Sequence, residues 1–374
     1  MTVLEDGGRE FAAEIAGRRR EPARLHLDMV GGRVVQVDLM RFVAFATITL
    51  IHVGWVETKD LNVHSGLMLL LRYSLPFFFM TSGYFAERHV HESSAYLHRV
   101  VLRLAGLFLF WELVYNGIHF FVCDFGYRAM PTTPREILTY AAITLNGGGV
   151  AFHLWFLPWL AVSLTVFMIL RRFGWRAVWI GSALLYALGL AVGPYNEFTG
   201  LYDQVARIFP EPAAFTARNG PFFGPIFIAF GAWVARHGDR VASVPAGVPE
   251  ATFLLGLAVF ALEASFISLH GIKMLSGFNF LFGSLIFAPA LFLIVMRRSV
   301  GPVGLGLARL GRYALGMYCI HGLFTLVYIQ SHPAQLRLQE PIADTFVTAA
   351  LVVTGSVAVT LVLARISVLR RFVA

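Results

Sequence analysis

The sequence predicts an all-α integral membrane protein with about ten transmembrane helices and with both termini in the cytoplasm. Three observations predict this class: the composition, the length of the apolar runs, and the placement of Lys and Arg between them. Of the 374 residues, 57% are hydrophobic and only 14% are charged, and the mean hydropathy is +0.68. Charged side chains are too few to coat a soluble globule of this size.

Apolar runs long enough to cross a bilayer recur along the chain. Crossing roughly 30 Å of hydrocarbon takes about 20 mostly apolar residues. The runs do not alternate in polarity as the strands of a membrane barrel do, so we expect helices. The predicted spans cover residues 36–56, 66–86, 97–122, 150–171, 175–193, 220–236, 247–269, 277–297, 312–330 and 345–366.

The basic residues set the expected orientation. If the N-terminus is inside, most of the 30 Lys and Arg residues fall in inner segments, as cytoplasmic loops require. This bias and the anionic inner leaflet account for the net charge of +8, and no basic and aromatic ladder indicates a nucleic-acid partner. Residues 1–33 lack the apolar core of a signal peptide and are expected to form a loosely ordered cytoplasmic tail, before a membrane domain at 34–374.

The first predicted span carries three ionisable residues, Asp38, Arg41 and His52. Charges inside a bilayer are costly and often mark function. Arg41 and His52 lie eleven residues apart, which places them on one helix face and roughly 16 Å apart along the axis. Asp38, one turn before Arg41, is positioned for a local ion pair. For either residue alone, snorkelling of Arg41 or an interhelical hydrogen bond of His52 is an equal alternative; together they favour function.

Other predicted spans add polar groups at comparable depths. A neutral imidazole that meets a carboxylate in a dry cavity is suited to take a proton from a hydroxyl. The sequence leaves open which carboxylate partners His52, and a structural hydrogen bond is an equal alternative for each further residue. Arg99 and Arg103, four residues apart, are placed to bind an anion, with snorkelling as the alternative. The further candidates are Arg72, Glu112, His153, Glu263, Tyr318 and His321.

The order of these motifs resembles that of the bacterial acyltransferase family 3, from about residue 34 to 366. The first span gives Asp38-x-x-Arg41 and an R-x(10)-H pattern from Arg41 to His52. One departure is that the family often has R-x-x-R at the third span, where this chain separates Arg99 and Arg103 by three residues. The other matching elements are PFFFMTSGY with Pro76, Ser82, Gly83 and Tyr84, then His153-Leu154-Trp155-Phe156-Leu157, and Tyr318-x-x-His321.

The resemblance implies a bacterial inner-membrane enzyme that moves an acyl group, usually acetyl, onto a hydroxyl of a cell-surface or exported carbohydrate. The donor would be cytoplasmic acyl-CoA, as a co-substrate and not a permanently bound cofactor. Arg41, with Arg99 and Arg103, would contact the phosphates of coenzyme A, and His52 would act as a base or as an acyl carrier. The predicted catalytic residues are His52, Arg41 and Glu263. The predicted substrate-binding residues are Asp38, Arg99, Arg103, Ser82, Tyr84, His153, Trp155, Tyr318 and His321.

Three alternatives remain at this stage. A proton-coupled transporter of a small anion or lipid-linked saccharide would also place Arg, His and Glu in its spans, although no internal repeat supports it. A scaffold for polysaccharide export would not need buried charges. A succinyl-transferring relative that acts on periplasmic glucans is the third. The two cysteines, Cys123 and Cys319, are predicted to form neither a disulfide nor a metal site, and no metal is expected.

Overall fold

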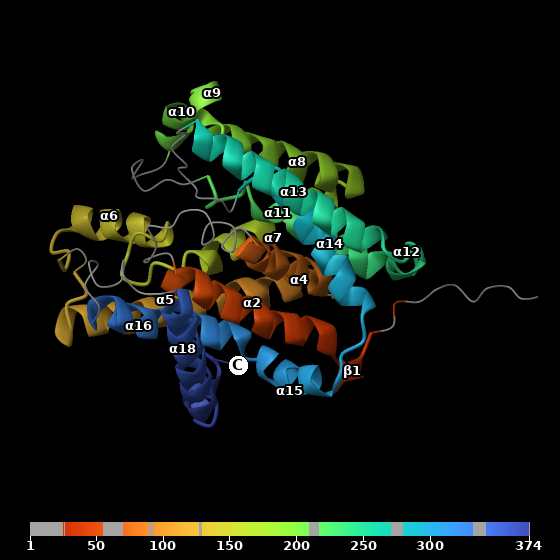
Figure 1. The fold of residues 1–374 in the computed structure, drawn as a ribbon. Coiled ribbons are helices and arrows are strands. Elements are labelled where there is room, and N and C mark those ends of the chain that lie inside the picture. The colour runs from red at the N-terminus through yellow and green to blue at the C-terminus, as the bar shows by residue number, and fades with distance from the viewer. Residues whose placement is uncertain are drawn as a thin grey trace, which may run out of the picture.

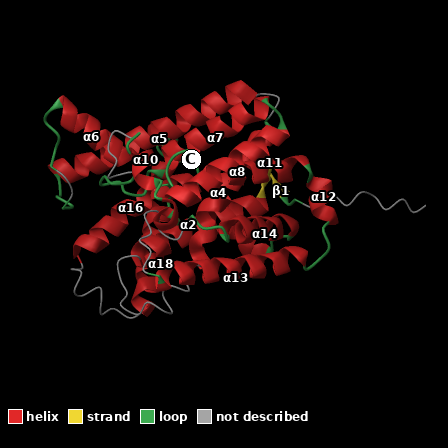
Figure 2. Cartoon of the chain, turned by 90° about the horizontal axis from the view of Figure 1, so that it is seen from above, coloured by secondary structure: helices red, strands yellow, loops and turns green. Residues whose placement is uncertain are grey.

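The computed structural model describes residues 25, 27–54, 70–89, 93–126, 129–208, 217–270, 280–331 and 342–373. Most of these residues are helical (Figures 1 and 2). The one sheet among them is an antiparallel hairpin of β1 (Met29–Val30) and β2 (Arg33–Val34), which turns through two glycines at positive φ. The predicted helical class is therefore confirmed.

Each of the ten predicted spans contains a helix. The predicted breaks at charged and Gly- or Pro-rich segments separate these helices, because such residues end an apolar helix or cannot continue it. The ten helices are α2 (Val35–Gly54), α4 (Ser74–Arg88), α5 (Ser93–Phe121), α7 (Phe156–Arg172), α8 (Trp175–Val192), α11 (Gly224–Arg236), α13 (Val248–Leu269), α14 (Ser284–Arg297), α16 (Ala314–Ser331) and α18 (Ile342–Leu363).

Shorter helices connect or flank these ten. The amphipathic α6 begins at a Pro, and Thr133 and Glu136 form a capping box there. The short elements are η1 (Leu71–Tyr73), α6 (Pro134–Leu145), α9 (Asn196–Thr199), α10 (Tyr202–Ala206), α12 (Gly238–Ser243), α15 (Pro302–Gly311) and α19 (Ser367–Arg370).

The described residues contain five helices that are long and apolar enough to cross a membrane: α2, α8, α13, α16 and α18. A sixth span results if α14 and α15, which meet at 118°, are counted as one broken span. The helices α4, α7 and α11 have only 15, 17 and 13 residues. The chain is therefore a multi-pass membrane protein, whereas the count of ten spans and the cytoplasmic placement of both termini stay predictions.

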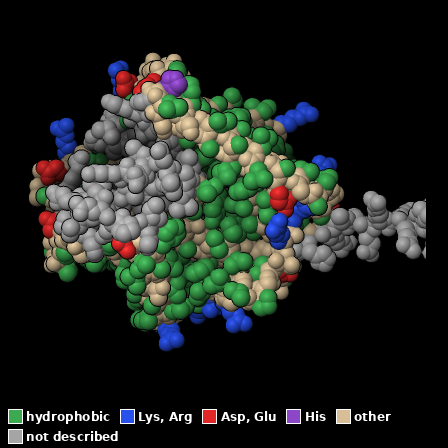
Figure 3. All heavy atoms as spheres, viewed as in Figure 1, with side chains coloured by type: hydrophobic (Ala, Val, Ile, Leu, Met, Phe, Trp, Pro, Cys, Tyr) green, Lys and Arg blue, Asp and Glu red, His purple; other side chains and the backbone are tan. Residues whose placement is uncertain are grey.

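The surface of the molecule fits a lipid environment. Apolar side chains cover much of the described part of the face in Figure 3, and most of the charged side chains lie toward its margins. Large apolar residues stand exposed on several long helices, among them Leu113 on α5, Leu184 on α8, Leu262 on α13 and Leu351 on α18. Such extensive exposure of Leu is stable in lipid but not in water.

Helix α2 lies in the middle of the fold. It packs against α4, α15, α16 and α18, and α4 in turn packs against α11 (Figure 1). The site residues predicted on α2 therefore face other helices and not only lipid.

The predicted tail at 1–33 falls mostly outside the described residues. Of its described residues, Arg33 belongs to the hairpin, and the Asp28 carboxylate accepts a hydrogen bond from the Val300 amide at 2.8 Å.

Glycines allow α4 and α11 to pack with their backbones in contact. A Cβ built on Gly83 would lie 2.0 Å from the carbonyl oxygen of Ile228, and one on Gly231 would lie 1.8 Å from that of Met80. Small residues at such crossings are a usual device of membrane helices, which gain little from apolar burial against lipid. The glycine of the PFFFMTSGY motif thus serves packing.

Gly83→Ala is expected to lower the free energy of unfolding by about 3 kcal/mol, because the added methyl group forces two backbones apart. Thermal unfolding of the purified protein in detergent measures this effect. The matched control is Gly106→Ala on α5, where an added Cβ meets no atom within 4 Å. Equal melting temperatures for the two variants would show that α4 and α11 do not pack in this way.

Candidate active site

Three histidines from distant parts of the chain meet beside α2. His52 lies near the end of α2, His321 lies on α16, and His153 lies in the turn that leads into α7. The His52 Nδ1 and His321 Nε2 atoms are 2.8 Å apart. The His153 ring centroid lies 4.7 Å from that of His321 and 6.2 Å from that of His52. The sequence predicted all three as site residues, and the structure brings them together.

The hydrogen bonds assign the protons of the His52 and His321 rings. The Nδ1 atom of His321 contacts the carbonyl oxygen of Tyr318, which can only accept, so this nitrogen carries the proton. In a neutral ring the Nε2 atom of His321 is then the acceptor, and the Nδ1 atom of His52 must donate to it. The Nε2 atom of His52 is left with a free lone pair, as a base or nucleophile requires.

The partner of His52 differs from the carboxylate that the sequence led us to consider. It is an imidazole whose own orientation is fixed by a backbone carbonyl one turn earlier on the same helix. A neutral partner serves a membrane site well, because it fixes a tautomer without burying a negative charge. His321 is completely buried, whereas His52 keeps part of its surface accessible. His52 is therefore the member of the pair that a substrate can reach.

His153 is held from two sides. Its Nε2 atom lies 3.3 Å from the carbonyl oxygen of Cys319, which also accepts the hydroxyl proton of Tyr115 at 2.8 Å. The hydroxyl of Tyr318 donates to the backbone carbonyl of His153. Among the described residues, the buried Nδ1 atom of His153 has no hydrogen-bond partner; it packs against Gly322, where an added Cβ would lie 2.6 Å away. Within the described residues, no group of three or more His, Cys, Asp or Glu side chains could hold a metal ion.

A group of cations surrounds the start of α2. The Asp38 carboxylate binds Arg33 with two bonds, at 2.6 and 2.7 Å, whereas its contact with Arg41 is longer, at 3.5 Å. The predicted ion pair of Asp38 and Arg41 is therefore weaker than the pair with Arg33. The Arg41 guanidinium stacks on the Phe85 ring at 5.2 Å, and Arg33 and Arg103 lie within electrostatic range of it. Several cations thus meet around the Asp38 carboxylate, an arrangement suited to a polyanion.

The remaining cation predicted for this group, Arg99, lies near the same place. Arg41, Arg99 and Arg103 all interact electrostatically with the Tyr96 hydroxyl. The three arginines predicted to contact coenzyme A are therefore neighbours, although the spacing of Arg99 and Arg103 departs from the family pattern. Arg33 belongs to the same group, and sequence reasoning assigned it to the tail because it precedes the first apolar run.

The two predicted binding residues of the second span make local contacts. The Ser82 hydroxyl donates to the carbonyl oxygen of Phe78 at 2.9 Å, one turn earlier on α4. The Tyr84 hydroxyl accepts a bond from Arg88 at 3.3 Å, near the C-terminal end of that helix. Tyr84 is next to Phe85, the ring under Arg41, so it borders the arginine group. Within the described residues, no hydrogen bond joins Ser82 or Tyr84 to the three histidines.

The predicted catalytic residue Glu263 lies on α13, and its contacts join that helix to the start of α14. Its carboxylate accepts bonds from the amides of Phe282 and Gly283, at 2.8 and 2.9 Å, just before α14 begins, and from the Tyr195 hydroxyl. It therefore fixes the start of α14 against α13. No bond from Glu263 to a histidine is found within the described residues. Glu112 bonds to Asn116 at 3.1 Å on its own helix and likewise is not the partner of His52.

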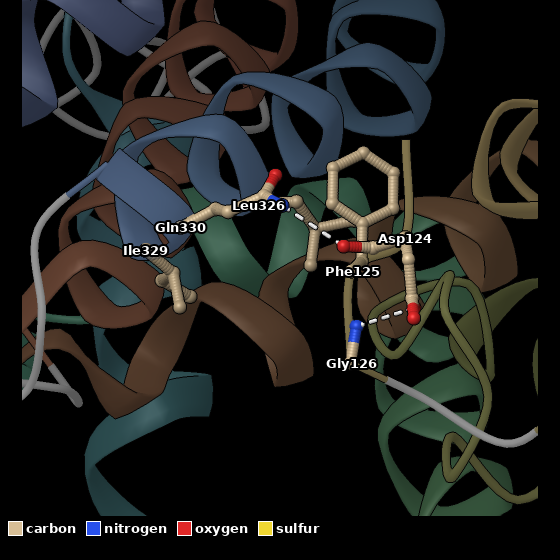
Figure 4. Close-up of a pocket in the computed structure, with 6 residues that line it drawn as sticks. All are labelled: Asp124, Phe125, Gly126, Leu326, Ile329 and Gln330. Carbon is tan, nitrogen blue, oxygen red and sulfur yellow. Dashed lines mark hydrogen bonds between the residues drawn. The ribbon is translucent and has the colours of Figure 1, made fainter. Parts of the chain in front are cut away.

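A hollow of about 500 Å³ lies beyond the histidines along α16 (Figure 4). It is lined by Asp124, Phe125, Gly126, Leu326, Ile329 and Gln330. The side-chain amide of Gln330 points toward Asp124 and donates to its backbone carbonyl at 2.9 Å. The side-chain amide of Gln330 is bonded at both ends, since its oxygen accepts from the Cys123 thiol, and the Asp124 carboxylate accepts from the Gly126 amide at 2.8 Å.

Comparisons with known proteins identify the family and leave the substrate open. The model of an acyltransferase domain, acyltransferase family 3, matches residues 34–365. A serine/alanine racemase of Enterococcus gallinarum is 26% identical over 257 residues, which are 64% of this chain and 34% of the relative. An amino-acid racemase of Enterococcus faecalis is 24% identical over 225 residues, 54% of this chain and 28% of the relative. The chain spans about a third of the length of these relatives, and no solved structure matches it.

Proposed function

This chain belongs to acyltransferase family 3, and we propose that it moves an acyl group, most simply acetyl, from cytoplasmic acyl-CoA to a hydroxyl of a cell-surface or exported carbohydrate. The observation that carries the proposal is the arrangement along α2. A base with a free Nε2 atom stands at one end of the helix, and a group of arginines stands at the other. An acyltransferase that uses coenzyme A needs a base for the acceptor and cations for the donor phosphates.

The reaction proceeds at the Nε2 atom of His52. The acceptor hydroxyl gives its proton to this nitrogen while its oxygen attacks the carbonyl carbon of the thioester. The carbon–sulfur bond then breaks, and the sulfur leaves as a thiol after it takes the proton from the imidazolium. His321 accepts a hydrogen bond from the other nitrogen throughout and holds the ring in place. Attack by His52 itself, with a transient acyl-imidazole, uses the same lone pair.

The proposed orientation places the arginines in the cytoplasm and the histidines toward the outer leaflet. Arg41 and His52 are separated by eleven residues of the continuous helix α2, or roughly 16 Å. The donor would bind from the cytoplasm and the carbohydrate would approach from the outside, where the hollow at Asp124 and Gln330 lies along α16 beyond His321. The proposed location is a bacterial inner membrane, with ten spans and both termini inside.

Transfer of label from acyl-CoA tests the proposal. Membranes that contain the protein are incubated with acetyl-CoA or succinyl-CoA labelled in the acyl group, together with the glycan fraction of the same cells. We expect label in the glycan, and the acyl group that is transferred separates the acetyl from the succinyl alternative. Uptake of a small anion or saccharide into sealed vesicles without any label on the glycan would instead support a transporter.

His321 is expected to act by positioning His52. In His321→Leu, the proton on Nδ1 of His52 loses its acceptor, so the ring can rotate or change tautomer, and we expect kcat to fall about 100-fold. His321→Gln keeps an acceptor oxygen and should retain more activity than His321→Leu. Steady-state kinetics with labelled acyl-CoA measure both variants. Equal activity of the Leu and Gln variants would show that the hydrogen bond has no part in the reaction.

A further inference from the structure

Arg218 extends the site on the side away from the arginine group. It lies in the turn before α11 and was not among the residues that the sequence suggested. Its guanidinium stacks on the ring of Trp155 with its carbon 4.0 Å from the ring centroid. His52 and Tyr318 both lie within electrostatic range of its charge. Arg218 is therefore a neighbour of the base and not of the donor-binding arginines.

The turn that carries Arg218 is bonded to the turn at Asn146. Asn219 is buried, and its side-chain amide donates to the backbone carbonyl of Asn146 at 3.0 Å. Gly220 follows at a φ of 93°, in the left-handed region that favours glycine. Gly147, next to Asn146, packs against Trp155, where an added Cβ would lie 2.9 Å from the ring. The turn at Asn146–Gly147 and the turn at Asn219–Gly220 are distant in sequence but bonded to each other, and together they hold Arg218 against Trp155.

No carboxylate neutralises Arg218 within the described residues. Among the described residues, its side chain makes a long hydrogen bond of 3.5 Å from Nε to the side-chain oxygen of Asn219. A second cation, Arg72 of η1, lies within electrostatic range of both Arg218 and His52. Like charges kept together in a partly buried place favour the binding of an anion. The charge of Arg218 is therefore available to a ligand.

We propose that Arg218 binds an anionic group of the acceptor, a carboxylate or a phosphate, beside the acceptor hydroxyl that His52 deprotonates. The inference rests on the proposed acyl transfer. Arg41 and its neighbours lie about 16 Å away along α2, so Arg218 is not the group that holds the donor phosphates.

The test compares anionic and neutral acceptors in membranes with labelled acetyl-CoA. The probes are a disaccharide that contains glucuronate, a disaccharide phosphate, and the corresponding neutral disaccharide. The quantity measured is the ratio of kcat/KM for each anionic acceptor to that for the neutral one. For Arg218→Gln we expect this ratio to fall about 10- to 100-fold, the range of a charge-assisted hydrogen bond. Arg218→Lys should keep most of the ratio, and Arg207→Gln, an exposed arginine of the same segment, should keep all of it.

The outcomes separate this inference from the function itself. The glucuronate and phosphate arms show which anion is preferred. If the wild-type protein acylates the neutral disaccharide with the same kcat/KM as both anionic ones, the inference is overturned, while the proposed acyltransferase function still holds. An Arg218→Gln variant with an unchanged ratio and a lower kcat for every acceptor also overturns it, since Arg218 would then stabilise the reaction's oxyanion. If label reaches none of the three acceptors and does not reach the cells' own glycan either, the proposed function is contradicted.

Discussion

His52→Ala is expected to lower kcat for acyl transfer by about 1,000-fold while the protein is still made and inserted. The range for loss of a general base is 10²- to 10⁴-fold, and this substitution also removes the group that would act as a nucleophile. The physical reason is the lone pair on Nε2, which the bond from Nδ1 to His321 leaves free. Label transfer from acyl-CoA in membranes with equal amounts of the two proteins measures the effect.

The matched control for His52 is His98→Ala. His98 lies exposed on α5, so its loss should change neither folding nor turnover. Melting temperatures of the purified variants show whether His52→Ala keeps the fold, which we expect because His52 is not fully buried. A folded His52→Ala protein with normal turnover would remove His52 from the mechanism.

Arg41→Ala is expected to raise KM for acyl-CoA about 10- to 100-fold, with a smaller effect on kcat. A guanidinium bound to a phosphate makes charge-assisted hydrogen bonds of about 1.5–3 kcal/mol, and these bonds are the same in the ground and transition states. Arg41 is suited to this role because Asp38 is occupied by Arg33, which leaves Arg41 with only the longer contact. Kinetics at varied acyl-CoA concentration measure the change.

Arg240→Ala is the control for Arg41, since Arg240 is an exposed arginine on α12 that belongs to neither site. An unchanged dependence on acyl-CoA concentration in Arg41→Ala would show that this arginine does not hold the donor. A fall in kcat with normal KM would place Arg41 in the transition state and not in donor binding.

Local patterns explain why the helices could be predicted. Each apolar run carries its own length and breaks, so α2, α13 and α18 begin and end close to the expected residues. The face shared by Arg41 and His52 follows from helical geometry alone. The helices α4, α11 and α14 begin later than the expected spans, at Ser74, Gly224 and Ser284. Before α14, the amides of Phe282 and Gly283 bond to Glu263 on α13, a contact between distant residues.

The contacts between distant residues could not be predicted in the same way. Nothing near His52 in sequence shows that its partner is His321, 269 residues later; the sequence led us to expect a carboxylate and left open which one. Glu263 instead binds the amides before α14, a role set by the approach of α13 and α14. Arg218 lay in a polar loop between spans, where a single arginine carries no periodic signal.

The central claim is that this membrane protein acylates a glycan through His52. Mass spectrometry of surface and secreted glycans tests it most directly, in cells that lack the gene and carry either the wild-type or the His52→Ala copy. We predict an acyl mass increment, that of acetyl or of succinyl, with the wild-type copy and its absence in the other two cultures. An increment of equal abundance in the His52→Ala cells, or identical glycans with and without the wild-type gene, would contradict the claim.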